Sequence, residues 1–170
     1  MLFRSGEILG LTVAQTTYLT AILAAGGLSG FAWASHVLSR GTDPFRMACR
    51  GAWVGIPAFA AVIISAPQAS ATLFSLGVFF IGYGAGLFGH GTLTATMNSA
   101  PSGEAGLALG AWGAVQASTA GLAMALGGIL RDVAAQWFES ATAYSLVYSL
   151  EIILLASTVL IMSPLVKVDR

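Results

Sequence analysis

The stretch that decides the fold is residues 51–103, GAWVGIPAFAAVIISAPQASATLFSLGVFFIGYGAGLFGHGTLTATMNSAPSG, which contains no Asp, Glu, Lys or Arg. As one helix, these 53 residues would be roughly 80 Å long at about 1.5 Å per residue. The hydrocarbon core of a bilayer is only about 30 Å thick, so the segment must cross a membrane twice. We predict the turn at SAPQAS, residues 65–70, because Pro67 lacks an amide donor and disfavours helix at Ala66.

The rest of the chain has the same membrane character. Of its 170 residues, 56% are hydrophobic and 8% are charged, and the mean hydropathy is +0.83. A water-soluble domain carries about a quarter charged residues. Three further uncharged stretches cover residues 8–39, 105–130 and 152–166. We therefore predict an all-α membrane bundle, one domain over residues 1–170, with five transmembrane helices at about 12–38, 45–65, 71–98, 104–130 and 143–164.

The distribution of basic residues predicts the orientation in a bacterial inner membrane. Two basic residues lie on one side of the predicted bundle, Arg4 and Arg131, and five lie on the other, namely Arg40, Arg46, Arg50, Lys167 and Arg170. Cytoplasmic loops carry the excess of Lys and Arg, which predicts an outside N-terminus and a cytoplasmic C-terminus. The beginning of the sequence lacks the pattern of a cleavable signal peptide. The formal net charge is zero, and no basic patch indicates a nucleic-acid partner.

Capping residues mark two of the helix starts. In RGTDPF, Gly41 suits a left-handed residue after the first helix, Asp43 suits a cap, and Pro44 suits the first turn of the next helix. In NSAPSGEAG, we expect Ser102 to cap the helix that follows. Cys49 is the single cysteine, which excludes an intrachain disulfide.

Glycines recur at intervals of three or four residues in three of the predicted helices. The helix at 104–130 also contains the segment LGAWGAVQASTAG, in which small residues surround Trp112 and Gln116. Small residues let helix backbones approach closely in lipid, so we expect the thin faces of these three helices to pack together. The predicted packing residues are Gly26, Gly30, Gly82, Gly86, Gly106, Gly110, Gly113, Gly121 and Gly128.

A polar group inside a bilayer is energetically unfavourable, so it is expected either to have a hydrogen-bond partner or to have a functional role. Glu151 lies about two turns into the last helix, where it either bonds a neighbouring helix or takes part in proton coupling or ligand contact. His90 lies deep in the helix at 71–98, on the same face as Tyr83. An imidazole there either packs or serves as a weak candidate ligand for chlorophyll magnesium.

Gln116 and Thr119 are predicted at mid-membrane depth, and Trp112 lies one turn before Gln116 on the same side. These side chains either pack or contact a polar substituent of a ligand. We therefore take Trp112, Gln116, Tyr83, His90 and Glu151 as the candidate pigment or substrate residues. Arg131 and Asp132 are expected to form an ion pair or a cap at the end of their helix.

No motif in the sequence indicates an enzyme. The chain has no cluster of histidines and cysteines at metal-ligand spacing, no phosphate-binding loop and no nucleophile with a base beside it. GYGAGLFGHG lies inside an uncharged membrane segment with no strand before it, which excludes a nucleotide loop. We predict no catalytic residue, no metal site and no intrinsic cofactor.

Several segments resemble the PucC/LhaA family of purple phototrophic bacteria. They are LGLTVAQTTYLTAILAAGGLSGFAWA (9–34), GLFGHGTLTATM (86–97), GLALGAWGAVQASTAGLAMALGGILRD (106–132) and VYSLEIILLASTVLIMSPLV (147–166). The resemblance implies a major facilitator fold of twelve helices in two halves, of which this chain would hold the last five. The N-terminal half and the seventh helix would be absent.

The resemblance also implies a function. Members of that family are implicated in assembling light-harvesting complexes, with bacteriochlorophyll as cargo and antenna polypeptides as partners. The missing half or another membrane chain is a further expected partner, besides the bilayer itself. Two alternatives stay open, namely a fragment of a proton-coupled transporter of small solutes and a structural subunit that contacts antenna helices without pigment.

Overall fold

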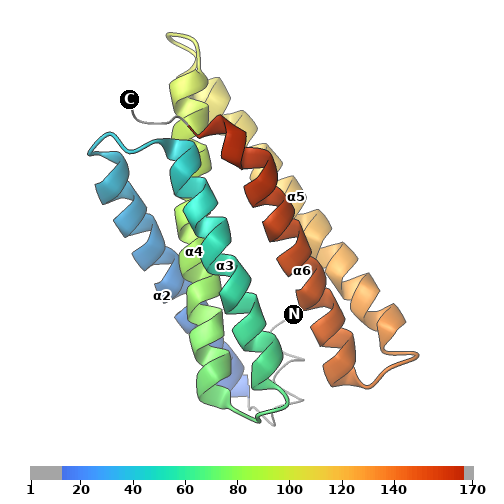
Figure 1. Ribbon diagram of the computed structural model, residues 1–170. Coiled ribbons are helices and arrows are strands. Elements are labelled where there is room, and N and C mark those ends of the chain that lie inside the picture. Colours follow the sequence, from blue (N-terminus) through green and yellow to red (C-terminus); the bar gives the residue numbers. More distant parts are fainter. Residues whose placement is uncertain (1–12, 167–170) are drawn as a thin grey trace.

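The computed structural model of the protein describes residues 13–166, which form five long helices and one short one (Figure 1). The long helices are α2 (Val13–Leu38), α3 (Pro44–Ser65), α4 (Ala71–Ser99), α5 (Ala105–Ala134) and α6 (Ser140–Met162), followed by the 3₁₀ helix η1 (Ser163–Leu165). All five long helices are long and apolar enough to cross a membrane. Within the described residues there is no strand, which confirms the all-α prediction.

The predicted helix ranges are close to those observed. The largest differences concern α5, which ends four residues later than expected, and α6, which begins three residues earlier. The apolar stretch of α5 ends at Leu130, but Arg131 forms an ion pair with Asp132 and donates to the Tyr144 hydroxyl at 3.3 Å. The helix continues through both charged residues to Ala134. Residue 12 and the basic residues Arg4, Lys167 and Arg170 of the orientation argument lie outside the described residues.

The capping prediction holds at α3 and is wrong at α5. The Oδ1 of Asp43 accepts a hydrogen bond from the Arg46 amide at 2.9 Å, and Gly41 has a left-handed φ of 88°. At the start of α5, however, the residue before the helix is Glu104 and it makes no side-chain cap bond. Gly103, which lies between Ser102 and Glu104, has a left-handed φ of 90°.

Helix α4 is the centre of the bundle, because it packs along both α2 and α3 while those two helices barely touch each other. On the α2 side, a Cβ added at Gly26 would overlap the carbonyl oxygen of Phe79, and one added at Gly82 would overlap that of Leu23. On the α3 side, a Cβ at Gly91 would lie 2.7 Å from the Ala48 amide nitrogen. Glycine therefore permits backbone contact on both sides of α4.

Two clusters of buried side chains fill the space around α4. One cluster contains Leu19, Val62, Phe74 and Val78. The other contains Ala34, Met47 and Leu87, with Tyr83 packed against it. Each cluster combines residues of α2, α3 and α4, so these three helices form the core of the described chain.

Helices α5 and α6 lie side by side and lean away from the core (Figure 1). Helix α6 is attached to α3, where the Tyr148 and Phe59 rings are 5.9 Å apart. Helix α5 is the most exposed element, and Ala134 is its single buried residue. Five of the predicted packing glycines face open space, with nothing near an added Cβ within 4 Å, namely Gly106, Gly110, Gly113, Gly121 and Gly128. Of the three thin faces expected to meet, those of α2 and α4 do so, whereas that of α5 meets no other part of the described chain.

The backbone contact between α2 and α4 predicts a difference between two substitutions in the same helix. Gly82→Val should destabilise the protein by about 1–3 kcal/mol, because the added side chain must push α2 away. Gly89→Val is the matched control, since nothing lies near an added Cβ at Gly89 within 4 Å. The measurement is the unfolding of both purified variants in the same detergent. Equal losses of stability would show that the α2 contact is not the cause.

Candidate functional site

The five predicted site residues lie in three places. Tyr83 and His90 are on the side of α4 that faces α2, Trp112 and Gln116 are on α5, and Glu151 is on α6. Thr92, which bonds Trp112, follows His90 by two residues, which is about 200° around a helix of 3.6 residues per turn. The predicted residues therefore divide between opposite sides of α4.

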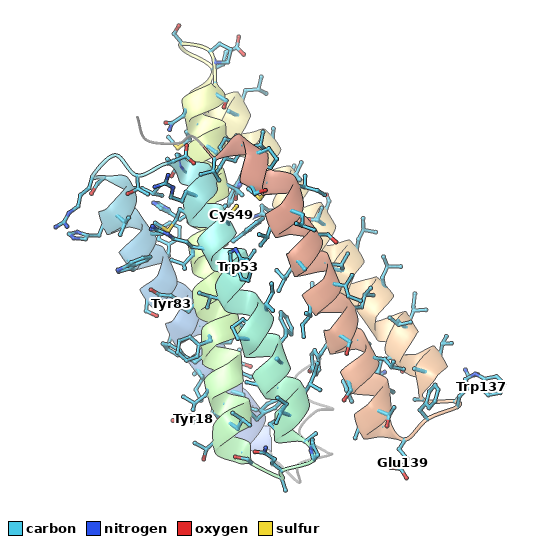
Figure 2. The ribbon with its side chains drawn as sticks, viewed as in Figure 1. Tyr18, Cys49, Trp53, Tyr83, Trp137 and Glu139 are labelled. Carbon is cyan, nitrogen blue, oxygen red and sulfur yellow. The ribbon has the colours of Figure 1, made fainter. Side chains whose placement is uncertain are left out.

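Tyr83 belongs to a row of aromatic side chains on α2 and α4. Its ring centroid lies 6.5 Å from that of Trp33 and 6.5 Å from that of Phe80. Phe80 lines a hollow of 540 Å³ between α3 and α4, and Trp53 lines the same hollow from α3. Figure 2 shows Trp53 and Tyr83 on these two helices. Apart from the indole N–H of Trp53, the side chains of the hollow are apolar, and Phe80 is the residue of the aromatic row that lines it.

The hollow is a feature that the sequence analysis missed. Its lining consists of Trp53, Val54, Pro57, Ala58, Ala61, Leu73, Leu76, Gly77 and Phe80. Gly77 lies where α4 closely contacts α3, because an added Cβ would lie 2.6 Å from a methyl group of Val62. Trp53 is 60% exposed. The sequence signal for this hollow was a tryptophan inside an uncharged span.

His90 packs on α2. Its ring lies 4.2 Å from that of Phe31, edge to face, and its buried Nδ1 has no hydrogen-bond partner among the described residues. Edge-to-face contact between two rings is a favourable packing arrangement. The imidazole is therefore placed by packing.

Trp112 joins α5 to α4. Its indole Nε1 donates to the Thr92 hydroxyl at 3.2 Å, and that hydroxyl donates in turn to the Phe88 carbonyl at 3.0 Å. Beside this bond lies a second hollow of 510 Å³, lined by Phe45 together with Thr92, Ala95, Thr96, Ser99, Ala100, Pro101 and Ala108. Because the single donor of the indole is used by Thr92, Trp112 offers a ligand its ring and no hydrogen bond.

The other polar candidates follow Trp112 along the same face of α5. Gln116 is half-buried, and its side-chain amide makes no hydrogen bond with the described part of the chain. Thr119, one turn further on, donates to the Val115 carbonyl at 2.7 Å. Thr119 and Glu151 both line a groove of 650 Å³ between α5 and α6. The polar line of α5 thus runs from the second hollow to this groove.

The glycines of α5 that were predicted to pack lie on the opposite face, whereas Gly127 lines the groove. Gly121 and Gly128 follow Thr119 by two and nine residues, which places both about 180–200° away around the helix. Helix α5 accordingly presents polar and large apolar groups toward α4 and α6, and small residues outward. Among residues 13–166, no atom lies within 4 Å of a Cβ added at these two glycines.

The Arg131 prediction is confirmed. The guanidinium forms an ion pair with Asp132, and it lies 5.7 Å from the ring centroid of Tyr144 on α6. These contacts connect α5 to α6 next to the 135–139 turn. They are structural, because they pair the Arg131 guanidinium with Asp132 and with the Tyr144 hydroxyl.

Comparison with known proteins gives consistent matches. A family model described as "PUCC protein" matches residues 4–169. Protein PucC of Rhodovulum sulfidophilum is 61% identical over 127 residues, which are 75% of this chain and 28% of the relative. Protein PucC of Cereibacter sphaeroides is 48% identical over 167 residues, 95% of this chain and 36% of the relative. Protein PucC of Rhodobacter capsulatus is 46% identical over 169 residues, which are 95% of this chain and 36% of the relative.

The chain spans about a third of the length of the curated relatives it matches. No solved structure gives a significant match. The relation to major facilitators therefore stays a prediction from the resemblance.

The bond between Trp112 and Thr92 predicts a measurable coupling between α4 and α5. In a double-mutant cycle, Trp112→Phe and Thr92→Val should each lower the free energy of unfolding, and the coupling should be about 0.5–1.5 kcal/mol, as for one neutral hydrogen bond. Unfolding in detergent is the measurement. The pair Thr158→Val and Trp112→Phe is the control, because the Thr158 hydroxyl bonds its own helix at Leu154. A coupling no larger than that of the control would show that the bond does not hold α5 in place.

Proposed function

The chain belongs to the PUCC protein family, and from this premise we propose that it takes part in assembling photosynthetic light-harvesting complexes by binding bacteriochlorophyll. The match over residues 4–169 carries the proposal, because it extends through all five helices. The five apolar spans place the protein in a bacterial membrane. The basic residues Arg40, Arg46 and Arg50 favour a cytoplasmic position for the end of the bundle at which α3 begins.

The hollow between α3 and α4 is the part of the structure that best suits such a pigment. Bacteriochlorophyll is a flat macrocycle with an apolar tail, and aromatic side chains stack on flat apolar ligands. Trp53 and Phe80 line the hollow, and Tyr83 and Trp33 continue the aromatic surface beside it. The fit rests on shape and apolar contact, since the indole N–H of Trp53 is the one polar group among the lining side chains.

His90 is not the pigment ligand in this proposal. It lies ten residues after Phe80, which is about 15 Å further along α4, and its ring is packed on Phe31. A pigment in the hollow would therefore take its fifth magnesium ligand from a partner or a water molecule. Trp112 and Gln116 lie on α5 and do not line this hollow, and Trp112 is bonded to Thr92 of α4.

A second candidate function is contact with antenna helices without pigment. The outward glycine face of α5 favours it, because small residues in lipid allow the close approach of another helix. Binding of an antenna polypeptide to the purified chain without any pigment would support this function. Uptake of a small solute driven by a pH gradient, measured with the complete protein, would instead favour the transporter.

The pigment proposal predicts that bacteriochlorophyll co-purifies with the chain after mild solubilisation. Trp53→Ala should lower the pigment bound per protein by about two- to tenfold, because one aromatic contact contributes about 0.5–1.5 kcal/mol. Absorption spectroscopy measures the ratio. Trp137→Ala is the matched control, since Trp137 is exposed in the turn between α5 and α6, far from the hollow (Figure 2). Equal loss in both variants would contradict binding at the hollow.

His90→Ala should leave the bound pigment unchanged. The reason is the distance of His90 from the hollow and its packing on Phe31. The same absorption ratio, compared with that of the unsubstituted chain, checks this outcome. Loss of pigment in a folded His90→Ala protein would make His90 the magnesium ligand and would move the site to the α2 side of α4.

A further inference from the structure

Arg50 is the last charged residue before the long uncharged run, and it lies on the face of α3 that lines the hollow. The lining residues Trp53, Val54 and Pro57 follow it by three, four and seven residues. At about 100° per residue, these positions lie within about 60° of Arg50 around the helix. Arg50 therefore stands in line with the hollow, about one turn of α3 before its first lining residue.

The hollow is closed at its Arg50 end by a contact between α3 and α4. A Cβ added at Gly51 would lie 2.5 Å from the Gly84 carbonyl oxygen, so the two backbones touch there. Val54 lines the hollow and also packs against the buried cluster that contains Met47. The apolar lining thus ends at close helix packing, and the exposed Arg50 side chain lies beside this end on the surface of the bundle.

The Arg50 guanidinium makes no hydrogen bond, ion pair or ring contact with the described residues. From Gly51 to Ser65, α3 is about 22 Å long, whereas the hydrocarbon core of a bilayer is about 30 Å thick. The backbone at Arg50 therefore lies inside the edge of the core. A cation at this depth is unfavourable without a partner, and an arginine near a helix end extends its charged group to the lipid headgroups. The guanidinium needs an anion at that level.

A phospholipid phosphate has the chemistry that this position requires. The guanidinium presents its N–H donors in a planar fork that matches phosphate oxygens. Basic pockets between membrane helices bind anionic headgroups. Bacteriochlorophyll has no anionic group, so the pigment alone would leave Arg50 without a counter-ion. A phospholipid supplies the anion and also an acyl chain, which can run from the headgroup over Trp53 into the apolar hollow.

We propose that Arg50 and the hollow between α3 and α4 form one site for an anionic phospholipid, with the phosphate at the guanidinium and an acyl chain on Trp53. The lipid occupies the hollow while no pigment is bound, and pigment displaces it. The displacement rests on the proposed function, whereas the lipid site does not.

Tryptophan fluorescence tests the lipid site. The 170-residue chain is made in a host without bacteriochlorophyll, stripped of host lipid in mild detergent, and titrated with phosphatidylglycerol or phosphatidylcholine that has brominated acyl chains. Bromine quenches an indole on contact, so the part of the quenching that is lost in Trp53→Phe reports the hollow. Phosphatidylglycerol should bind about fivefold more tightly than phosphatidylcholine, because one arginine near the headgroups favours a net negative lipid by about this factor.

Substitution of Arg50 tests the position of the phosphate. Arg50→Gln should lower the affinity for phosphatidylglycerol to about that for phosphatidylcholine, and the quenching that remains with both lipids shows that the hollow is intact. Arg50→Lys retains the charge and should retain most of the preference. Arg40→Gln is the matched control, because Arg40 is an exposed cation at the same end of the bundle but lies in the turn after α2.

Three outcomes overturn the lipid site. A preference for phosphatidylglycerol that persists in Arg50→Gln would show that Arg50 does not bind the phosphate. An equal loss in Arg40→Gln would show general attraction to a basic surface. Absence of any quenching that depends on Trp53 would show that the hollow accepts no acyl chain.

Added bacteriochlorophyll tests the displacement. As pigment binds to the unsubstituted chain, the phosphatidylglycerol that stays with it through gel filtration should fall, which mass spectrometry measures. Pigment and lipid bound to the same molecule would overturn the displacement. Failure of the pigment to bind would overturn the proposed function and the displacement with it, while the lipid preference set by Arg50 would stand.

Discussion

The contact between the backbones of α2 and α4 is the constraint on which the rest of the structure depends. In lipid, apolar side chains are as well solvated outside the protein as inside, so helices associate by close packing. Gly26 on α2 and Gly82 on α4 allow this close packing between the two helices. Gly91 allows the same backbone contact between α4 and α3. The central helix is thereby fixed by dispersion contacts from two directions, and no interhelical hydrogen bond is needed in that part of the core.

This arrangement determines which side chains a ligand or a partner can contact. Two faces of α4 are occupied by helix contacts, so the row from Trp33 through Tyr83 to Phe80 lies where α2 and α3 diverge. The far side of α4 carries Thr92 and receives α5 through Trp112. Aromatic groups and polar groups are therefore separated by the thickness of one helix. A flat apolar ligand and a polar protein partner would meet different sides of the same bundle.

The sequence was sufficient to predict where the helices lie along the chain, but it did not predict which helices pack together. Uncharged runs longer than one crossing, together with Pro67 and Asp43, placed the five spans because each signal acts on the local backbone. Helical spacing correctly put Tyr83 and His90 on one face. Helical spacing did not predict that this face packs on α2, or that Trp112 contacts the other side of α4. The spacing of side chains shows which residues share a face, but not which helix packs against that face. The hollow beside Trp53 lies between two helices, so it could not be predicted before the packing of those helices was known.

Helix α5 shows why a thin and polar helix is useful at the edge of a bundle. Its face toward α4 and α6 carries Trp112, Gln116 and Thr119, and the opposite face carries the glycines. A helix that packed only on its own chain would need one such face. Two different faces, one with polar groups and one with small residues, are expected of a helix that is enclosed from both sides in its working state. Within the described residues neither face of α5 is fully covered, so both faces are available for contact with a partner.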